Sequence, residues 1–113
     1  MKALSAALVA AAFVGLMVRP AHAVDEELKI GVVAAESGSF VSAGNTIVAA
    51  AKLATQQIND AGGIKIGGKT YKIKLYIRDN RTDVNVTIAA ARELVDDIGV
   101  KAIWGTETHD VKK

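Results

Sequence analysis

The stretch Leu28–Ala35 constrains the fold of this chain more than any other segment. It reads Leu-Lys-Ile-Gly-Val-Val-Ala-Ala, which is mostly apolar and lacks the strict alternation of a strand with one face in water. Such a run is typical of a strand that helices cover on both faces. A loop of small residues follows at Glu36–Gly44, and apolar residues at helical spacing follow from Asn45. The order favours an α/β fold whose first loop lies at the carboxyl end of a buried strand.

The remainder of the chain continues the alternation of helices and strands. Apolar spacing predicts helices over about Asn45–Asp60 and Val84–Asp97. Strands are predicted over Tyr71–Arg78, which suits an edge position, and over Val100–Trp104, with Trp104 in the core. The order predicts right-handed crossovers, and hence a three-layer parallel sheet with helices on both faces. The third strand is expected beside the first, away from the second, with an open outer edge.

The first 23 residues have the pattern of an export signal. Lys2 precedes an apolar run at Ala3–Val18, and Ala21-His-Ala23 forms a small-x-small cleavage pattern. We therefore expect residues 1–23 to be a signal peptide. A membrane anchor is the alternative, but the run is near the lower limit for a span and no basic cluster follows it directly.

The absence of cysteine and the charge balance limit the class of protein further. With no cysteine in the chain, disulfides, metal–thiolate sites and lipid attachment at the cleavage site are excluded. A periplasmic protein that is not a lipoprotein is therefore expected. Cleavage would remove Lys2 and Arg19 from the 14 basic residues, leaving 12 against 12 acidic ones. A near-neutral chain without a basic cluster argues against binding to nucleic acid.

One motif match is misleading. Gly63–Thr70 satisfies G-x-x-x-x-G-K-T, the phosphate-binding loop of nucleotide hydrolases. That loop binds phosphate because it follows a strand and opens a helix, so that backbone N–H groups converge on the ligand. Here a helix precedes the motif and a strand follows it. We therefore interpret the segment as a hairpin turn.

Two loops carry the candidate binding residues. Ser37, Gly38, Ser39 and Phe40 combine hydroxyls, exposed N–H groups and a ring, which suit a zwitterionic or amide ligand. An ordinary loop whose serines bond their own backbone is an equally good interpretation of this spacing. The second loop follows the third strand and supplies Thr106 and Thr108. A crevice between the carboxyl ends of the first and third strands is the expected site in a doubly wound sheet.

The acidic residues do not suggest a metal or catalytic centre. Asp83 or the threonine before it can cap the following helix, and Asp79 belongs to the same polar loop. Asp96 and Asp97 lie at a helix end without a histidine nearby, so solvated caps are favoured over metal ligands. His109, the only histidine after cleavage, has no organised partner for a catalytic triad. No metal, cofactor or catalytic residue is expected.

Several segments together resemble one known family. The resemblance is carried by the following runs: Leu28–Val33, Ser37–Phe40, Gln57–Ile64 (Gln-Ile-Asn-Asp-Ala-Gly-Gly-Ile), Leu75–Asp83 and Ala89–Asp97. In these runs the chain is similar to the periplasmic leucine/isoleucine/valine-type substrate-binding proteins of ABC transporters, which have the type I periplasmic-binding fold. The similarity extends over nearly all of the chain after the signal peptide, with the elements in the family's order.

The resemblance implies two α/β lobes that close on an amino acid or amide and deliver it to a membrane permease. Residues 24–113 would then be the amino-terminal, first βαβαβ part of lobe 1. Ligand contacts are implied for the loop Ser37–Gly44 and for the loop after the third strand. The chain departs from the family pattern at Ser39, where proline is usual, and at Ala43, where some members have a ligand-facing tyrosine. The tail after Gly105 also departs from it.

Three alternatives remain open at this point. The same fold could serve as the ligand-sensing domain of a receptor, or the chain could be an inactive truncated product. An enzyme of doubly wound type would need a nucleophile and a base that these residues do not supply.

Overall fold

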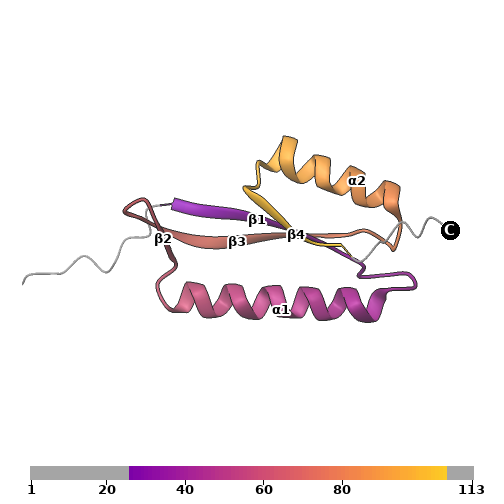
Figure 1. Ribbon diagram of the computed structural model, residues 1–113, viewed down its shortest axis with the longest axis horizontal. Coiled ribbons are helices and arrows are strands. Elements are labelled where there is room, and N and C mark those ends of the chain that lie inside the picture. Colours follow the sequence, from indigo (N-terminus) through magenta and orange to yellow (C-terminus); the bar gives the residue numbers. More distant parts are fainter. Residues whose placement is uncertain (1–25, 107–113) are drawn as a thin grey trace, which may run out of the picture.

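A single sheet with a helix on each face forms the described part of the chain. The computed structural model describes residues 26–106. Its elements in chain order are β1 (Glu26–Ala34), α1 (Val41–Asp60), β2 (Ile64–Ile66), β3 (Lys69–Asp79), α2 (Val84–Arg92), the π-helical turn η1 (Glu93–Ile98) and β4 (Ala102–Gly105). The helices α1 and α2 lie on opposite faces of the sheet (Figure 1). The predicted three-layer α/β architecture is confirmed.

The strand β1 lies in the middle of the sheet, whose order is β2-β3-β1-β4. It pairs in parallel with β3 from Glu26↔Tyr71 to Ala34↔Asp79. On its other side it pairs in parallel with β4, from Ile30↔Ala102 onward. The expected position of the third strand, beside the first and away from the second, is therefore confirmed.

The prediction of an all-parallel sheet was wrong, because β2 pairs antiparallel with β3. Gly67 and Gly68 join the two strands with φ of 57° and 80°. Glycine adopts these angles without a steric penalty, and two such residues make the tight turn that suits the twist of a hairpin. The sheet is therefore mixed. The segment that matched a phosphate-binding loop is this hairpin, as interpreted from the sequence.

The helix α1 begins at Val41, four residues before the predicted start. Its buried positions are Gly44, Val48 and Ala51, which pack on β1. A Cβ at Gly44 would overlap the backbone of Ala35, so only glycine lets the first helical turn approach the end of β1 this closely. The loop after β1 is consequently shorter than expected from the sequence.

The second helix follows its predicted start closely. Asp83 caps α2 by accepting a hydrogen bond from Val86 N at 2.9 Å, which confirms the predicted cap. Ala90 and Leu94 pack with Val33 on the second face of the sheet. η1 continues the helix, which ends at Gly99.

Two side-chain contacts tie the helices to β3. The guanidinium of Arg78 donates two hydrogen bonds to Glu93, from Nε at 3.0 Å and Nη2 at 2.8 Å. On the other face, Asn59 at the end of α1 donates from Nδ2 to Ile73 O and accepts from Ile73 N, both at 2.8 Å. Asn59 thus supplies the hydrogen bonds that a neighbouring strand would give to this edge of β3.

The strand β4 forms the opposite edge of the sheet. Ile103 and Trp104 are 36% and 48% exposed. The expected open outer edge is therefore present, whereas the prediction that Trp104 lies in the core was wrong. No further strand of residues 26–106 pairs with the outer side of β4.

Candidate functional site

The loop Ser37–Phe40 connects β1 to α1 at the carboxyl end of the sheet (Figure 1). All four of its residues are exposed, and Phe40 leaves 48% of its surface open. Phe40 stands at the N-cap position of α1 and makes no side-chain cap. The loop therefore presents hydroxyls and a ring to solvent rather than packing beneath other side chains.

Asp79, at the end of β3, is hydrogen-bonded to the start of this loop. Its Oδ1 accepts from Glu36 N at 2.9 Å and from Arg81 N at 2.8 Å, and its Oδ2 accepts from Ser37 Oγ at 2.7 Å. The in-register pairing Ala34↔Asp79 places this carboxylate beside the point where the chain leaves β1. The Ser37 hydroxyl, a candidate ligand donor, is thus already used as a donor within the protein.

These contacts favour the ionised form of Asp79. The hydroxyl of Ser37, followed by the Arg81 N–H, lowers the pKa of the Asp79 carboxyl below its ordinary value of 3.8. Hydrogen bonds to a carboxylate stabilise its charged form relative to the protonated acid. At neutral pH the Asp79 carboxylate is therefore ionised, and the hydrogen bonds that it accepts from the loop are charge-assisted.

Thr82 is hydrogen-bonded to the backbone of the same loop. Its Oγ1 donates to Ser37 O at 2.9 Å and accepts from Phe40 N at 3.2 Å. Gly38 makes this approach possible, because with φ of +85° any Cβ would lie 2.8 Å from Arg81 O and closer still to the Thr82 side chain. One hydroxyl therefore joins both ends of the segment Ser37–Phe40.

The loop after β3 is itself stabilised by hydrogen bonds of Asn80, which is fully buried. Asn80 N donates to Ala34 O at 3.0 Å, and Asn80 Oδ1 accepts from Thr82 N at 2.9 Å. Its Nδ2 has no hydrogen-bond partner among the described residues. Arg81 and Thr82 adopt φ of 54° and 58°, the left-handed region that non-glycine residues seldom occupy.

The structure describes some of the site residues predicted from the sequence and leaves others outside the described range. The structure brings Ser37, Gly38, Ser39 and Phe40 together in one exposed loop, and Thr106 follows β4 at the same end of the sheet. Thr108 and His109 lie outside the described residues. The role of all these candidates as ligand contacts stays a prediction.

Sequence reasoning missed Asp79 and Thr82 as partners of the loop Ser37–Phe40. The sequence favours Asp79 as part of a polar capping loop over a role as metal ligand. The available signal was the predicted parallel pairing of the two strands, which brings their carboxyl ends to one edge. That pairing places the polar run after the second strand beside the loop after the first.

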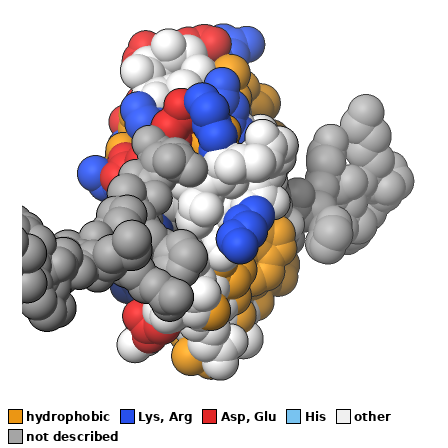
Figure 2. All heavy atoms as spheres, turned by 90° about the vertical axis from the view of Figure 1, so that its left-hand side faces the viewer, with side chains coloured by type: hydrophobic (Ala, Val, Ile, Leu, Met, Phe, Trp, Pro, Cys, Tyr) orange, Lys and Arg blue, Asp and Glu red, His pale blue; other side chains and the backbone are white. Residues whose placement is uncertain are grey.

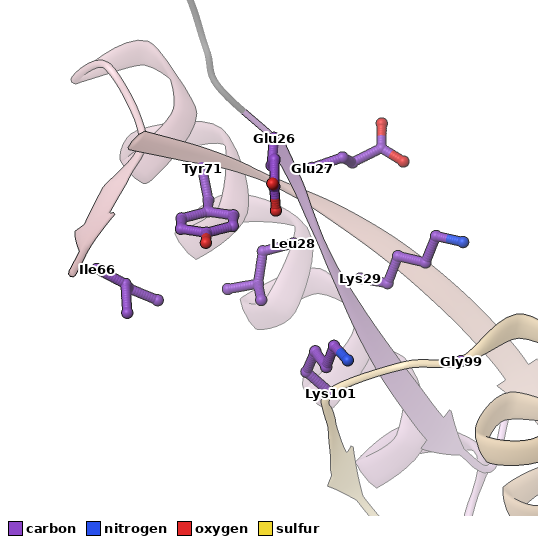
Figure 3. A pocket seen from close by; sticks show the side chains of 8 residues that line it. All are labelled: Glu26, Glu27, Leu28, Lys29, Ile66, Tyr71, Gly99 and Lys101. Atoms are coloured by element: carbon purple, nitrogen blue, oxygen red, sulfur yellow. The ribbon is translucent and has the colours of Figure 1, made fainter. Parts of the chain in front are cut away.

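A hollow lies at the opposite end of the strands. It has a volume of about 580 Å³ and is lined by Glu26, Glu27, Leu28, Lys29, Ile66, Tyr71, Gly99 and Lys101. Figure 3 shows Leu28, Ile66 and Tyr71 facing it, while Glu27 and Lys29 project from the other side of β1. In Figure 2, which looks at this end of the molecule, hydrophobic side chains gather at the surface near a basic one. The hollow does not involve the loop Ser37–Phe40.

Neither a metal site nor a membrane span is found in the described part. Residues 26–106 contain no group of three or more histidine, cysteine, aspartate or glutamate side chains placed to hold a metal ion. Over the same residues, no helix combines the length and the apolar character that crossing a bilayer demands.

A family model described as "Periplasmic binding protein" matches residues 27–112. The chain belongs to this family. Curated relatives named "Leu/Ile/Val-binding protein homolog 8", from Brucella abortus and Brucella suis, are 35% identical over 80 residues, which is 71% of this chain. This stretch spans 19% of those relatives, so the chain covers about a fifth of their length.

Solved structures of periplasmic binding proteins show the same fold. The branched-chain amino acid transporter substrate-binding protein LivJ from Streptococcus pneumoniae, in complex with isoleucine, is 34% identical with a TM-score of 0.64. The similarity covers 71% of this chain and 22% of LivJ. A putative branched-chain amino acid ABC transporter protein from Silicibacter pomeroyi is 28% identical, with a TM-score of 0.60, over 68% of this chain and 19% of that protein.

A third periplasmic binding protein was solved with a different ligand. The solute-binding protein of an ABC transporter from Rhodopseudomonas palustris, in complex with 3,4-dihydroxybenzoic acid, is 28% identical with a TM-score of 0.55. The similarity covers 68% of this chain and 20% of that protein. The family and type I fold inferred from the sequence are therefore confirmed, while relatives of similar identity differ in the ligand they hold.

Proposed function

We propose that this chain is the amino-terminal part of the first lobe of an extracytoplasmic substrate-binding protein that serves an ABC transporter. The proposed ligand is a branched-chain amino acid or a related amino acid or amide. The proposed partner is the permease of that transporter in the inner membrane. The proposal assigns no catalytic step to the chain.

The observation that carries the proposal is the similarity to LivJ, which was solved with isoleucine bound. The curated relatives are likewise named for leucine, isoleucine and valine. Since the chain covers about a fifth of these relatives, the activity belongs to the whole protein and the chain is proposed to supply one wall of its site.

The chemistry of the exposed loop supports a small zwitterionic ligand. Ser39 Oγ is exposed and makes no hydrogen bond to the described residues, so it can donate to a carboxylate. The Phe40 ring, 48% exposed, offers apolar surface next to it. A few convergent polar groups beside apolar surface are typical of small-molecule sites. Thr106 and Thr108 are proposed to contribute from the loop after β4.

The proposed location outside the cytoplasm rests on residues 1–23 and on the family. The leader pattern described above would export the chain, and the family is one of periplasmic binding proteins. Mass spectrometry of the protein secreted into a bacterial periplasm would show an amino terminus at Val24 if cleavage follows Ala23.

The test of ligand binding is a nuclear magnetic resonance titration of the purified chain with L-isoleucine, L-leucine and L-valine. We expect chemical-shift changes at Ser39, Phe40 and Thr106. D-isoleucine serves as the stereochemical control, and 3,4-dihydroxybenzoic acid tests the alternative ligand found in a relative. If only 3,4-dihydroxybenzoic acid gave saturable shifts, the proposed ligand class would change from amino acids to aromatic acids. If none of these compounds gave shifts, the result would contradict ligand binding by this chain.

A further inference from the structure

We infer that Asp79 and Thr82 are positioning residues that hold the loop Ser37–Phe40 in its ligand-facing shape, and that Ser39 rather than Ser37 is the loop hydroxyl that contacts the ligand. The inference rests on the proposed function and divides its candidate residues into two roles. Ser37 joins the protein's own hydrogen bonds, whereas Ser39 is left to the ligand.

The first step concerns Asp79, whose two carboxylate oxygens are both used. Oδ2 accepts a hydrogen bond from the Ser37 hydroxyl at 2.7 Å, and Oδ1 accepts from the N–H groups of Glu36 and Arg81. A serine hydroxyl has one proton to donate. Ser37 could therefore donate to a ligand carboxylate only by giving up a charge-assisted hydrogen bond.

The second step concerns Thr82, which contacts the loop at two points. The hydroxyl of Thr82 donates to Ser37 O and accepts from Phe40 N, so it joins the residues on either side of Gly38 and Ser39. These bonds fix the backbone around Ser39 while leaving the Ser39 side chain exposed and without a partner among the described residues. A group held in this way is pre-organised for binding.

The third step is the conformation that brings Thr82 to the loop. Arg81 and Thr82 occupy the left-handed region, which is unfavourable for residues with a Cβ. The buried Asn80 holds them there, through its own N–H to Ala34 O and its Oδ1 to Thr82 N. Unfavourable backbone conformations persist where surrounding contacts impose them, and they cluster at ligand sites.

The experiment compares two substitutions of Thr82 that differ by the hydroxyl. Thr82→Val removes both hydrogen bonds and keeps the branched shape, whereas Thr82→Ser keeps the hydroxyl. Thr87→Val is the matched control, because Thr87 Oγ1 donates to Asp83 O at 2.8 Å within α2 and does not contact the loop. The readouts are amide hydrogen exchange at Phe40 and the affinity for L-isoleucine.

We expect Thr82→Val to accelerate exchange at Phe40 and weaken isoleucine binding, each by about tenfold, which is the scale of one lost hydrogen bond. Thr82→Ser and Thr87→Val should stay near the unsubstituted chain in both readouts. Ser39→Ala should weaken binding without accelerating exchange at Phe40, whereas Ser37→Ala should accelerate exchange at Glu36. The split between the two serines is a result that a general loss of stability would not produce.

The outcomes separate this inference from the proposed function. If the unsubstituted chain binds none of the amino acids, the proposed function of the chain fails, and the exchange data alone decide whether Thr82 fixes the loop. Equal exchange at Phe40 in Thr82→Val and Thr82→Ser would overturn the positioning role. Unchanged isoleucine affinity in Ser39→Ala, together with a loss in Ser37→Ala, would reverse the assignment of the two serines.

Discussion

The two ends of the sheet differ in how their connections are held. At the carboxyl end, the loops after β1 and β3 are joined by hydrogen bonds through Asp79 and Thr82, and Gly44 brings α1 against the end of β1. At the amino end, a Cβ added at Gly67 or Gly68 of the hairpin would meet no heavy atom within 4 Å, although one added at Gly63, before β2, would overlap the backbone of Tyr71. The hollow of about 580 Å³ also lies at that end of the strands.

The hollow follows from the lengths of the neighbouring strands. Near its carboxyl end β1 has a neighbour on both sides, whereas β4 pairs only from Ile30↔Ala102 onward. Lys29 O accepts from Lys101 N at 2.9 Å, so Glu26–Leu28 pair with β3 alone, and their vacant side becomes part of the hollow. The hollow thus marks where β4 has not yet begun, whereas at the candidate site the loops after β1 and β3 are joined by hydrogen bonds.

The largest expected effect comes from adding a methyl group at the carboxyl end. Gly44→Ala places a Cβ onto the backbone of Ala35, and we expect a loss of about 3 kcal/mol in the free energy of unfolding, since overpacked backbone cannot yield easily. The matched substitution at the amino end, Gly67→Ala, meets no atom and should lose only about 1 kcal/mol from its left-handed conformation. Urea unfolding measures both, and equal losses would contradict the difference between the two ends.

A smaller effect is expected from two asparagines that bond the backbone. Asn80→Ala leaves the N–H of Thr82 without its buried acceptor, and we expect a loss of about 2 kcal/mol in unfolding free energy. Asn59→Ala removes two bonds to Ile73, but at a half-buried sheet edge where water can replace them, so about 1 kcal/mol is expected. Thermal unfolding of both variants tests the order, and a larger loss for Asn59→Ala would reverse it.

The smallest expected effect is a pH dependence confined to the carboxyl end. The pKa of Asp79 is lowered on folding, so its stabilising contribution is complete above the ordinary pKa of 3.8 and is lost as the pH falls through the lower folded value. Amide exchange at Glu36, corrected for its intrinsic pH dependence, should therefore rise in that acid range.

The control for this pH dependence is Asp79→Asn, which removes the titrating group and should abolish the step at Glu36. The pKa of the Glu93 carboxyl is also lowered, by the hydrogen bond from Arg78. Glu93 lies on the face covered by α2, away from the loop, so reading the step at the Glu36 amide separates the two groups. Persistence of the step in Asp79→Asn would show that Asp79 is not its origin.

Local hydrophobic patterns predicted the layers, and the doubly wound topology predicted which strands lie beside β1. The expected edge position of the strand at Tyr71–Arg78 was wrong, because β2 pairs with the outer side of β3. The apolar run Leu28–Ala35 and the alternation at Tyr71–Arg78 specify a buried strand and a half-polar one. The short antiparallel strand β2 was missed, since three residues carry too little pattern to separate a strand from a turn. The exposed position of Trp104 depends on which elements lie beside β4, and composition does not report this.

The candidate site was predictable only in part. The residues of the loop Ser37–Phe40 could be selected by residue type and position after a strand. Their hydrogen bonds could not, because Asp79 and Thr82 lie more than 40 residues away and meet the loop only through the register of β1 and β3. The early start of α1 likewise depends on the close contact between Gly44 and Ala35, a tertiary effect.

At Thr82, the left-handed backbone favours glycine, whereas the hydrogen bonds to the loop need a hydroxyl. Glycine at this position would relax the main chain but would remove the hydroxyl that joins the loop, whereas any other residue that keeps a hydroxyl keeps the torsional penalty. Substitution by glycine therefore exchanges a torsional gain for the loss of the two hydrogen bonds to Ser37 O and Phe40 N, so the two effects on stability oppose each other. Selection for the proposed ligand binding should favour threonine or serine at this position.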